Sequence, residues 1–187
     1  VRKKLKWSDK PFETPQKILD EWKKIGNKGE LLEKKWQDSL NKKNPKIKSE
    51  LEKNYINSDL NELEQLIKKE KKKYFDSKPS LATRQCSMAV IESISKIFPQ
   101  LIGGSADLSG SNNTKTNNSK IINAKSFDGN YIHYGVREHG MAAVMNGLAL
   151  YGGFIPYGGT FLIFSDYCKP SIRLSALMGL KVIYIFS

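Results

Sequence analysis

The sequence predicts an α/β fold, a parallel sheet with flanking helices, preceded by a mostly helical connector. Residues 81–187 alternate short apolar strands with helical segments, and this alternation favours a parallel sheet with right-handed crossovers. Residues 182–186 are continuously apolar, as expected for a strand that is covered on both faces. Residues 1–80 carry only helical periodicity. We therefore expect a helical inter-domain connector over 1–80 and a partial sheet domain over 81–187.

The connector is predicted to consist of three helices that pack on something larger. In the first, Ile18, Trp22 and Ile25 recur at intervals of three or four residues, which is the spacing of one helix face. Thr14 supplies an N-cap, and Pro15 takes the first helical position, where its missing N–H would have no helical partner. The three predicted helices cover 15–40, 47–55 and 60–74.

The second region is predicted to be a sheet domain that is cut short. Its four strands lack a closing helix, and the chain has no initiator Met, so we expect a fragment of a longer protein. The expected elements, in order, are helix 83–97, strand 101–107, polar loop 109–120, strand 131–134, helix 141–150, strand 154–156, helix 161–178 and strand 181–186.

The charge distribution favours solvated helix faces over a phosphate-binding stripe. The chain carries 31 Lys or Arg and 19 Asp or Glu, a net charge of +12, and residues 1–80 hold 22 of the basic and 14 of the acidic residues. Acidic residues interrupt the lysines nearly everywhere except at 68–73. We expect no nucleic-acid partner, and a basic nucleic-acid-binding helical module stays as an alternative.

Cysteine content and hydropathy indicate a cytoplasmic protein. Cys86 and Cys168 are far apart, so they form neither a disulfide framework nor a metal-ligand cluster, and we expect two free thiols in a reducing compartment. The basic start of the chain is not followed by an apolar run, which argues against a signal peptide. We expect no membrane partner, because no stretch of about 18 apolar residues occurs.

The segment Tyr-Gly-Val-Arg-Glu-His at 134–139 is the strongest candidate site. It places the carboxylate of Glu138 between a strand and a small-residue helix, a junction at which open α/β sheets bind ligands. An ordinary structural explanation also exists, since the helix dipole favours an acidic residue in the first turn. In a parallel sheet, Asp107, Glu138 and the turn at 158–161 would meet at one edge.

Five segments together resemble transketolase, the thiamine-diphosphate enzyme of the pentose phosphate pathway. The resemblance covers nearly the whole chain, with 82–187 similar to the first part of the pyrimidine-binding domain and 1–80 similar to the connector that precedes it. An Arg-Glu-His triplet sets it apart from deoxyxylulose-phosphate synthase and the pyruvate dehydrogenase β-subunit, in which Gln follows the Glu. The segments are Ala-Thr-Arg at 82–84, Ile-Gly-Gly-Ser-Ala-Asp-Leu at 102–108, Tyr-Gly-Val-Arg-Glu-His at 134–139, Pro-Tyr-Gly-Gly-Thr-Phe at 156–161 and Arg-Leu-Ser-Ala-Leu at 173–177.

The resemblance implies a cofactor site for thiamine diphosphate. Glu138 would be the catalytic residue, which hydrogen-bonds the ring nitrogen of the aminopyrimidine. Phe161, Phe164 and Tyr167 would form the apolar wall against the pyrimidine ring. The Mg²⁺ or Ca²⁺ ligands of the family belong to a Gly-Asp-Gly motif that this chain lacks, so we expect them outside the fragment.

The resemblance also implies substrates and a partner subunit. Asp107 would contact sugar hydroxyls, while Arg84 and Ser111 would bind the sugar phosphate, with Arg as a fork donor. In this family the cofactor lies between the pyrimidine domain of one subunit and the diphosphate domain of another, so a homodimer is implied. The parent would transfer a two-carbon ketol unit from a ketose phosphate to an aldose phosphate, and the fragment alone would be inactive. A dihydroxyacetone synthase-like enzyme and a non-catalytic transketolase-like binding module are the alternatives.

Overall fold

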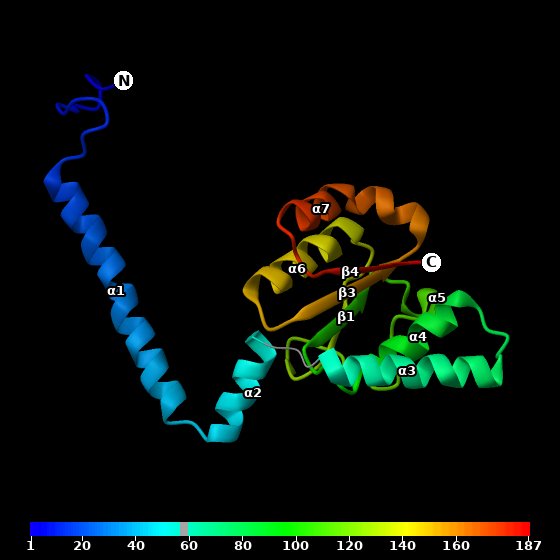
Figure 1. The fold of residues 1–187 in the computed structure, drawn as a ribbon. Coiled ribbons are helices and arrows are strands. Elements are labelled where there is room, and N and C mark those ends of the chain that lie inside the picture. Colours follow the sequence, from blue (N-terminus) through cyan, green and yellow to red (C-terminus); the bar gives the residue numbers. More distant parts are fainter. Residues whose placement is uncertain (57–59) are drawn as a thin grey trace. The chain divides into compact units, whose positions relative to one another are not determined.

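The computed structural model describes residues 1–56 and 60–187, which form two compact units, Val1–Leu51 and Glu52–Ser187 (Figure 1). The first unit contains α1 (Gln16–Asn41) and the start of α2 (Pro45–Ile56), close to the predicted bounds. No residue of α1 is buried, and most of its apolar side chains, among them Trp22 and Trp36, are exposed. Helix α1 therefore has an amphipathic face that its own unit leaves uncovered.

The second unit is built around a sheet of four parallel strands in the order β2-β1-β3-β4. This confirms the predicted α/β fold with flanking helices. The elements of the unit are α3 (Leu60–Ser77), α4 (Thr83–Ser95), β1 (Leu101–Ser105), α5 (Ser109–Asn112), β2 (Tyr131–His133), α6 (Glu138–Tyr151), β3 (Ile155–Thr160), the 3-10 helix η1 (Leu162–Phe164), α7 (Ser165–Leu177) and β4 (Ile183–Phe186).

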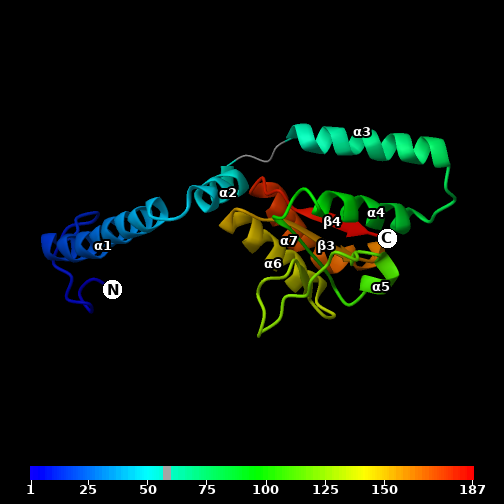
Figure 2. The same ribbon diagram turned by 90° about the horizontal axis from the view of Figure 1, so that it is seen from below.

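Helices cover both faces of this sheet. Figures 1 and 2 show α6 and α7 on one face and α3 with α4 on the other. Successive side chains of a strand point to opposite faces, so each face builds its own core. On the α4 face, Ile91 packs with Leu101 and Tyr157. On the α6 face, Met141 and Met145 are fully buried.

Two strand glycines allow the helices and strands to pack this closely. A Cβ on Gly103 would overlap the ring of Tyr157, whose hydroxyl is held by a 2.9 Å hydrogen bond that it donates to the Thr114 carbonyl. A Cβ on Gly158 would overlap the sulfur of Met145. Both positions therefore need glycine for close approach.

The structure corrects two predicted loops. The segment 109–120 was expected to be a polar loop, but it begins with the short helix α5. The glycine pair at 158–159 was expected to form a turn, but it lies inside β3, where both neighbouring strands pair with it. The glycines reflect side-chain packing on the sheet rather than chain reversal, which sequence alone does not distinguish.

One further expectation at the C-terminal end is also wrong. The helix expected at 161–178 begins as the separate 3-10 turn η1, and α7 starts only at Ser165. The apolar strand at 182–186 was expected to be covered on both faces. Among the described residues β4 is an edge strand, but its Tyr184 packs on the α6-side core and its Ile185 on the α4-side core, while Ile183 is 45% exposed.

Candidate functional site

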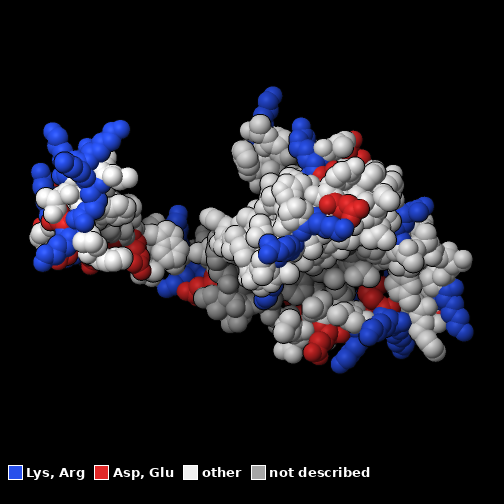
Figure 3. Space-filling view, turned by 90° about the horizontal axis from the view of Figure 1, so that it is seen from above, with Lys and Arg blue, Asp and Glu red and all other residues white. Residues whose placement is uncertain are grey.

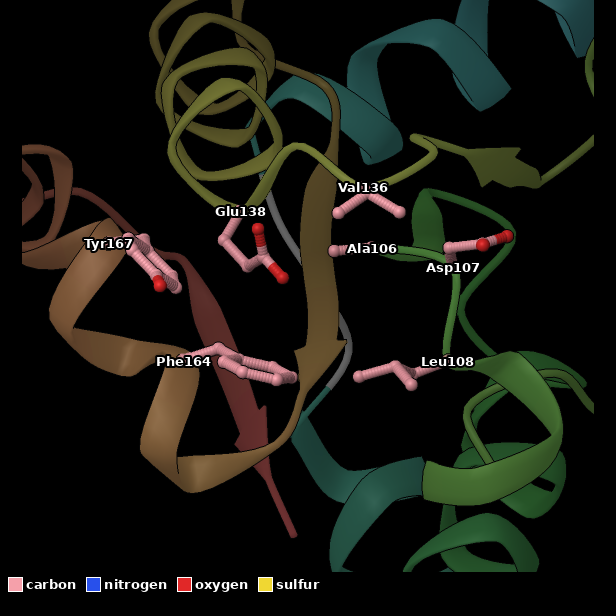
Figure 4. A pocket seen from close by; sticks show the side chains of 7 residues that line it. All are labelled: Ala106, Asp107, Leu108, Val136, Glu138, Phe164 and Tyr167. Atoms are coloured by element: carbon pink, nitrogen blue, oxygen red, sulfur yellow. The ribbon is translucent and has the colours of Figure 1, made fainter.

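A pocket of about 370 Å³ opens at the carboxyl end of the sheet (Figure 4). The chain leaves β1 for β2 on one side, while β3 pairs with the other side of β1, so the pocket lies at a topological switch point. It is lined by Ala106, Asp107 and Leu108 after β1, by Val136 and Glu138 after β2, and by Phe164 and Tyr167 after β3. The structure thus brings together four of the predicted site residues, Asp107, Glu138, Phe164 and Tyr167.

Glu138 is the first residue of α6, and its side chain points into the pocket (Figure 4). The residue is only 8% exposed. Within the described part of the chain, its carboxylate accepts no hydrogen bond and forms no ion pair. The neighbouring Arg137 turns away and donates to the Tyr134 carbonyl at 3.1 Å. Burying a carboxylate without a partner costs free energy. Such an unpaired acid is expected where a bound ligand supplies the missing partner.

Aromatic side chains form the opposite wall. The rings of Phe164 and Tyr167 are stacked with centroids 6.1 Å apart, and the Phe161 ring lies 6.0 Å from Phe164. Figure 4 shows Phe164 facing Leu108 across the pocket. Phe161 does not line the pocket but supports Phe164 from the end of β3. The pocket therefore offers a flat apolar surface next to a single buried acid.

Asp107 lies at the rim in a left-handed backbone conformation, with φ of 63°. This conformation is uncommon for a residue with a Cβ and is often found at ligand sites. The turn is held by Ser105, whose hydroxyl donates to the Gly159 carbonyl at 3.0 Å and accepts from the Leu108 amide at 3.1 Å. In Figure 4 the Asp107 carboxylate points away from Glu138, so the two acids do not face each other.

Arg84 and Ser111 lie outside this pocket. Arg84 is in the first turn of α4 and Ser111 is in α5, and both are exposed. The pocket also includes Ala106, Leu108 and Val136, which sequence reasoning did not single out. Their only signal in the sequence is adjacency to Asp107 and Glu138, since short apolar residues carry no chemistry of their own.

Two weakly acidic side chains near the pocket, Cys168 and Tyr134, stay neutral. Burial raises the pKa of the Cys168 thiol on α7, and the negative charge of Glu138 raises it further. Burial also raises the pKa of Tyr134 to about 12. Both groups keep their protons at neutral pH and carry no charge. The acidic group that points into the pocket is Glu138.

In residues 1–56 and 60–187, no cluster of three or more His, Cys, Asp or Glu side chains could hold a metal ion. No helix described there is long and apolar enough to cross a membrane. Figure 3 shows Lys and Arg side chains at the surface of the described residues, with Asp and Glu among them.

The fold and the pocket define an α/β ligand-binding domain with an acid opposite an aromatic wall. Residues 79–187 match the family described as the transketolase, pyrimidine binding domain. The chain belongs to this family, which confirms the resemblance found in the sequence.

Relatives extend the likeness over the whole chain. A transketolase of Sinorhizobium medicae is 45% identical over all 187 residues, which span 27% of its length. The transketolase structure from Campylobacter jejuni is 33% identical, with 99% of this chain and 27% of that chain covered at a TM-score of 0.81. The transketolase of Pichia stipitis in complex with sedoheptulose 7-phosphate is 28% identical, with 95% and 27% covered at a TM-score of 0.79. The chain thus spans about a quarter of the length of these proteins.

Proposed function

We propose that this chain is the pyrimidine-binding part of a longer cytoplasmic transketolase. That protein would transfer a two-carbon ketol unit from a ketose phosphate to an aldose phosphate in the pentose phosphate pathway. The observation that carries the proposal is the unpartnered, buried carboxylate of Glu138, placed opposite the rings of Phe164 and Tyr167 in a chain of this family. We retain the division into a connector over 1–80 and a pyrimidine-binding region over 81–187.

The pocket fits the aminopyrimidine ring of thiamine diphosphate. Its volume of about 370 Å³ is within the range of small-molecule sites, and its walls are mostly apolar. A flat heteroaromatic ring would lie against Phe164 and Tyr167, and its ring nitrogen would meet the Glu138 carboxylate. Bound thiamine diphosphate supplies the carbon nucleophile that takes up the ketol unit.

The Glu138 carboxylate would form a hydrogen bond with the ring nitrogen of the aminopyrimidine. A hydrogen bond of this kind is stronger in a site that excludes water, because the local dielectric is low. Phe164 and Tyr167 would exclude water from one side, and Phe161 would keep the Phe164 ring in place. On the other side Ala106 and Val136 would do the same.

Substrate groups would be bound nearer the surface. The Asp107 carboxylate at the rim would accept hydrogen bonds from sugar hydroxyls, and Arg84 and Ser111, both exposed, would bind the phosphate. The diphosphate and its Mg²⁺ or Ca²⁺ would be held by a domain beyond residues 1–187, contributed by the second subunit of a homodimer.

The test is Glu138→Gln in the full-length protein, assayed for ketol transfer with thiamine diphosphate and Mg²⁺. The amide keeps the shape but does not share a proton with the ring nitrogen, so we expect transfer to fall by a factor on the order of 10²–10⁴. Glu92→Gln is the matched control, since Glu92 is a half-buried acid on α4 outside the pocket. Unchanged transfer in Glu138→Gln contradicts the proposal. If the parent binds the cofactor but transfers no ketol unit, the result would favour the non-catalytic binding module. If the parent prefers non-phosphorylated acceptors, the result would favour the dihydroxyacetone synthase-like enzyme.

A further inference from the structure

A chain of buried polar side chains joins α6 to α7 behind the pocket. Asn146 on α6 is 5% exposed, while Ser171 and Ser175 on α7 are 2% and 7% exposed. The Asn146 Nδ2 donates to the Ser171 carbonyl at 2.9 Å, and the Ser175 hydroxyl donates to the Asn146 Oδ1 at 2.5 Å. We call these three residues the α6–α7 clamp.

The clamp is extended at both ends. At the pocket end, the Ser171 hydroxyl lies 3.2 Å from Nδ1 of His139, the residue after Glu138. At the sheet, the Ser175 hydroxyl lies 3.0 Å from the hydroxyl of Tyr184 on β4. The Ser175 hydroxyl also lies 3.0 Å from the Ser171 carbonyl, so its single proton has two acceptors within the clamp, and the Tyr184 hydroxyl proton is available for the pair with Ser175. Burial raises the pKa of Tyr184, so its hydroxyl keeps this proton.

A clamp of buried polar groups adds little net stability to two packed helices. Buried polar groups gain little net stability over well-packed apolar ones, but their bonds are directional, and losing one partner leaves the other unsatisfied. Helix α7 also contains Pro170, which lacks the N–H that would bond the carbonyl of the preceding turn. The clamp therefore holds one register of α7 against α6 next to Pro170, where α7 lacks a backbone hydrogen bond.

That register decides the geometry of the pocket. Glu138 begins α6, eight residues before Asn146, or roughly 12 Å along the helix. Tyr167 lies on α7 four residues before Ser171, or roughly 6 Å. Both helices are continuous between these points, so a slip at the clamp would change the gap between the Glu138 carboxylate and the aromatic wall.

We propose that Asn146 is a positioning residue, which sets the spacing between Glu138 and the rings of Phe164 and Tyr167 by fixing α6 against α7. The inference rests on the proposed function, because the spacing matters only if a ring is bound there. Asn146 itself does not line the pocket. It acts through the two helices that carry the residues facing the ligand.

The experiment compares three alanine variants of the full-length protein. Asn146→Ala removes both bonds of the clamp, and Ser175→Ala removes one of them. Ser93→Ala is the matched control, because its hydroxyl also joins two helices, by a 3.1 Å bond to Glu70 on α3. Three quantities are measured: thermal unfolding, amide exchange at 138–141 and 164–168 without cofactor, and exchange of the thiazolium carbon proton at saturating thiamine diphosphate with Mg²⁺.

We expect proton exchange to fall about 10- to 100-fold in Asn146→Ala, as for a misplacement of roughly 1 Å, less in Ser175→Ala, and not at all in Ser93→Ala. Amide exchange near the pocket should rise in the same order. A purely structural clamp would lower thermal stability but leave the rate per cofactor-saturated molecule unchanged, and that result overturns the proposal. If Asn146→Ala does not fold, an unchanged rate in Ser175→Ala overturns it. Normal proton exchange in Glu138→Gln would instead refute the proposed function.

Discussion

Replacing Glu138 by Ala should separate the stability of the domain from its activity. Glu138 is only 8% exposed, and among the described residues its carboxylate has no hydrogen-bond partner or counter-ion. It occupies the first turn of α6, where the helix dipole favours an acidic side chain. Replacing Glu138 by Ala therefore loses a small favourable interaction with the helix dipole and removes the free-energy cost of an unpaired buried charge.

The size of each contribution can be bounded. Loss of the dipole interaction costs about 0.3–1 kcal/mol of the free energy of unfolding. Burying an unpaired carboxylate costs several kcal/mol when water is excluded, and less here because the pocket opens to solvent. We expect the free energy of unfolding to stay within about 1 kcal/mol of the parent, or to rise. For a chain of this size, about 1 kcal/mol corresponds to a change of about 2–4 °C in the melting temperature.

The assay is thermal unfolding of the 187-residue chain, paired with ketol transfer by the full-length protein. Met141→Ala is the control on the same helix, because Met141 is fully buried and its truncation should cost about 2–5 kcal/mol. The expected pattern is a normal or raised melting temperature with transfer nearly abolished. A clear fall in the melting temperature with normal transfer would mean that Glu138 only caps α6, and the reasoning about the site would be refuted.

Two predictions test the substrate site and the packing of the sheet. In the full-length protein, Arg84→Ala should weaken the binding of phosphorylated substrates by about 1.5–3 kcal/mol, the contribution of a charged hydrogen bond. An equal loss of binding with non-phosphorylated acceptors would mean that Arg84 has a structural role. Gly103→Ala should destabilise the domain by about 1–3 kcal/mol, because the new methyl group overlaps the Tyr157 ring. Gly147→Ala in α6, where nothing lies within 4 Å of the added carbon, should stabilise it by about 0.5–1 kcal/mol, and denaturant unfolding of both variants checks the contrast.

Sequence alone predicted most of the local structure and the family, although it missed α5, η1 and the position of the 158–159 glycines inside β3. Alternation of apolar strands with helices predicts the parallel sheet, because each element must bury one face, and the observed strands and helices begin near the predicted residues. Glu138 could be chosen from its position between a strand and a helix. The five segments identified the family because they occur together in this order and spacing, although each is a weak signal alone.

Only the tertiary structure decided which side chains meet. Asp107, Glu138 and Tyr167 are distant in sequence, and they line one pocket because β1 lies between β2 and β3, an order that periodicity does not encode. Arg84 belongs to the segment at 82–84 and Ser111 follows the segment at 102–108, but both lie outside that pocket. The bonds of Asn146 depend on the register of α6 against α7, which is set by packing over the sheet. Local patterns report the period of an element and its exposed face, whereas proximity between elements is settled only when they pack together.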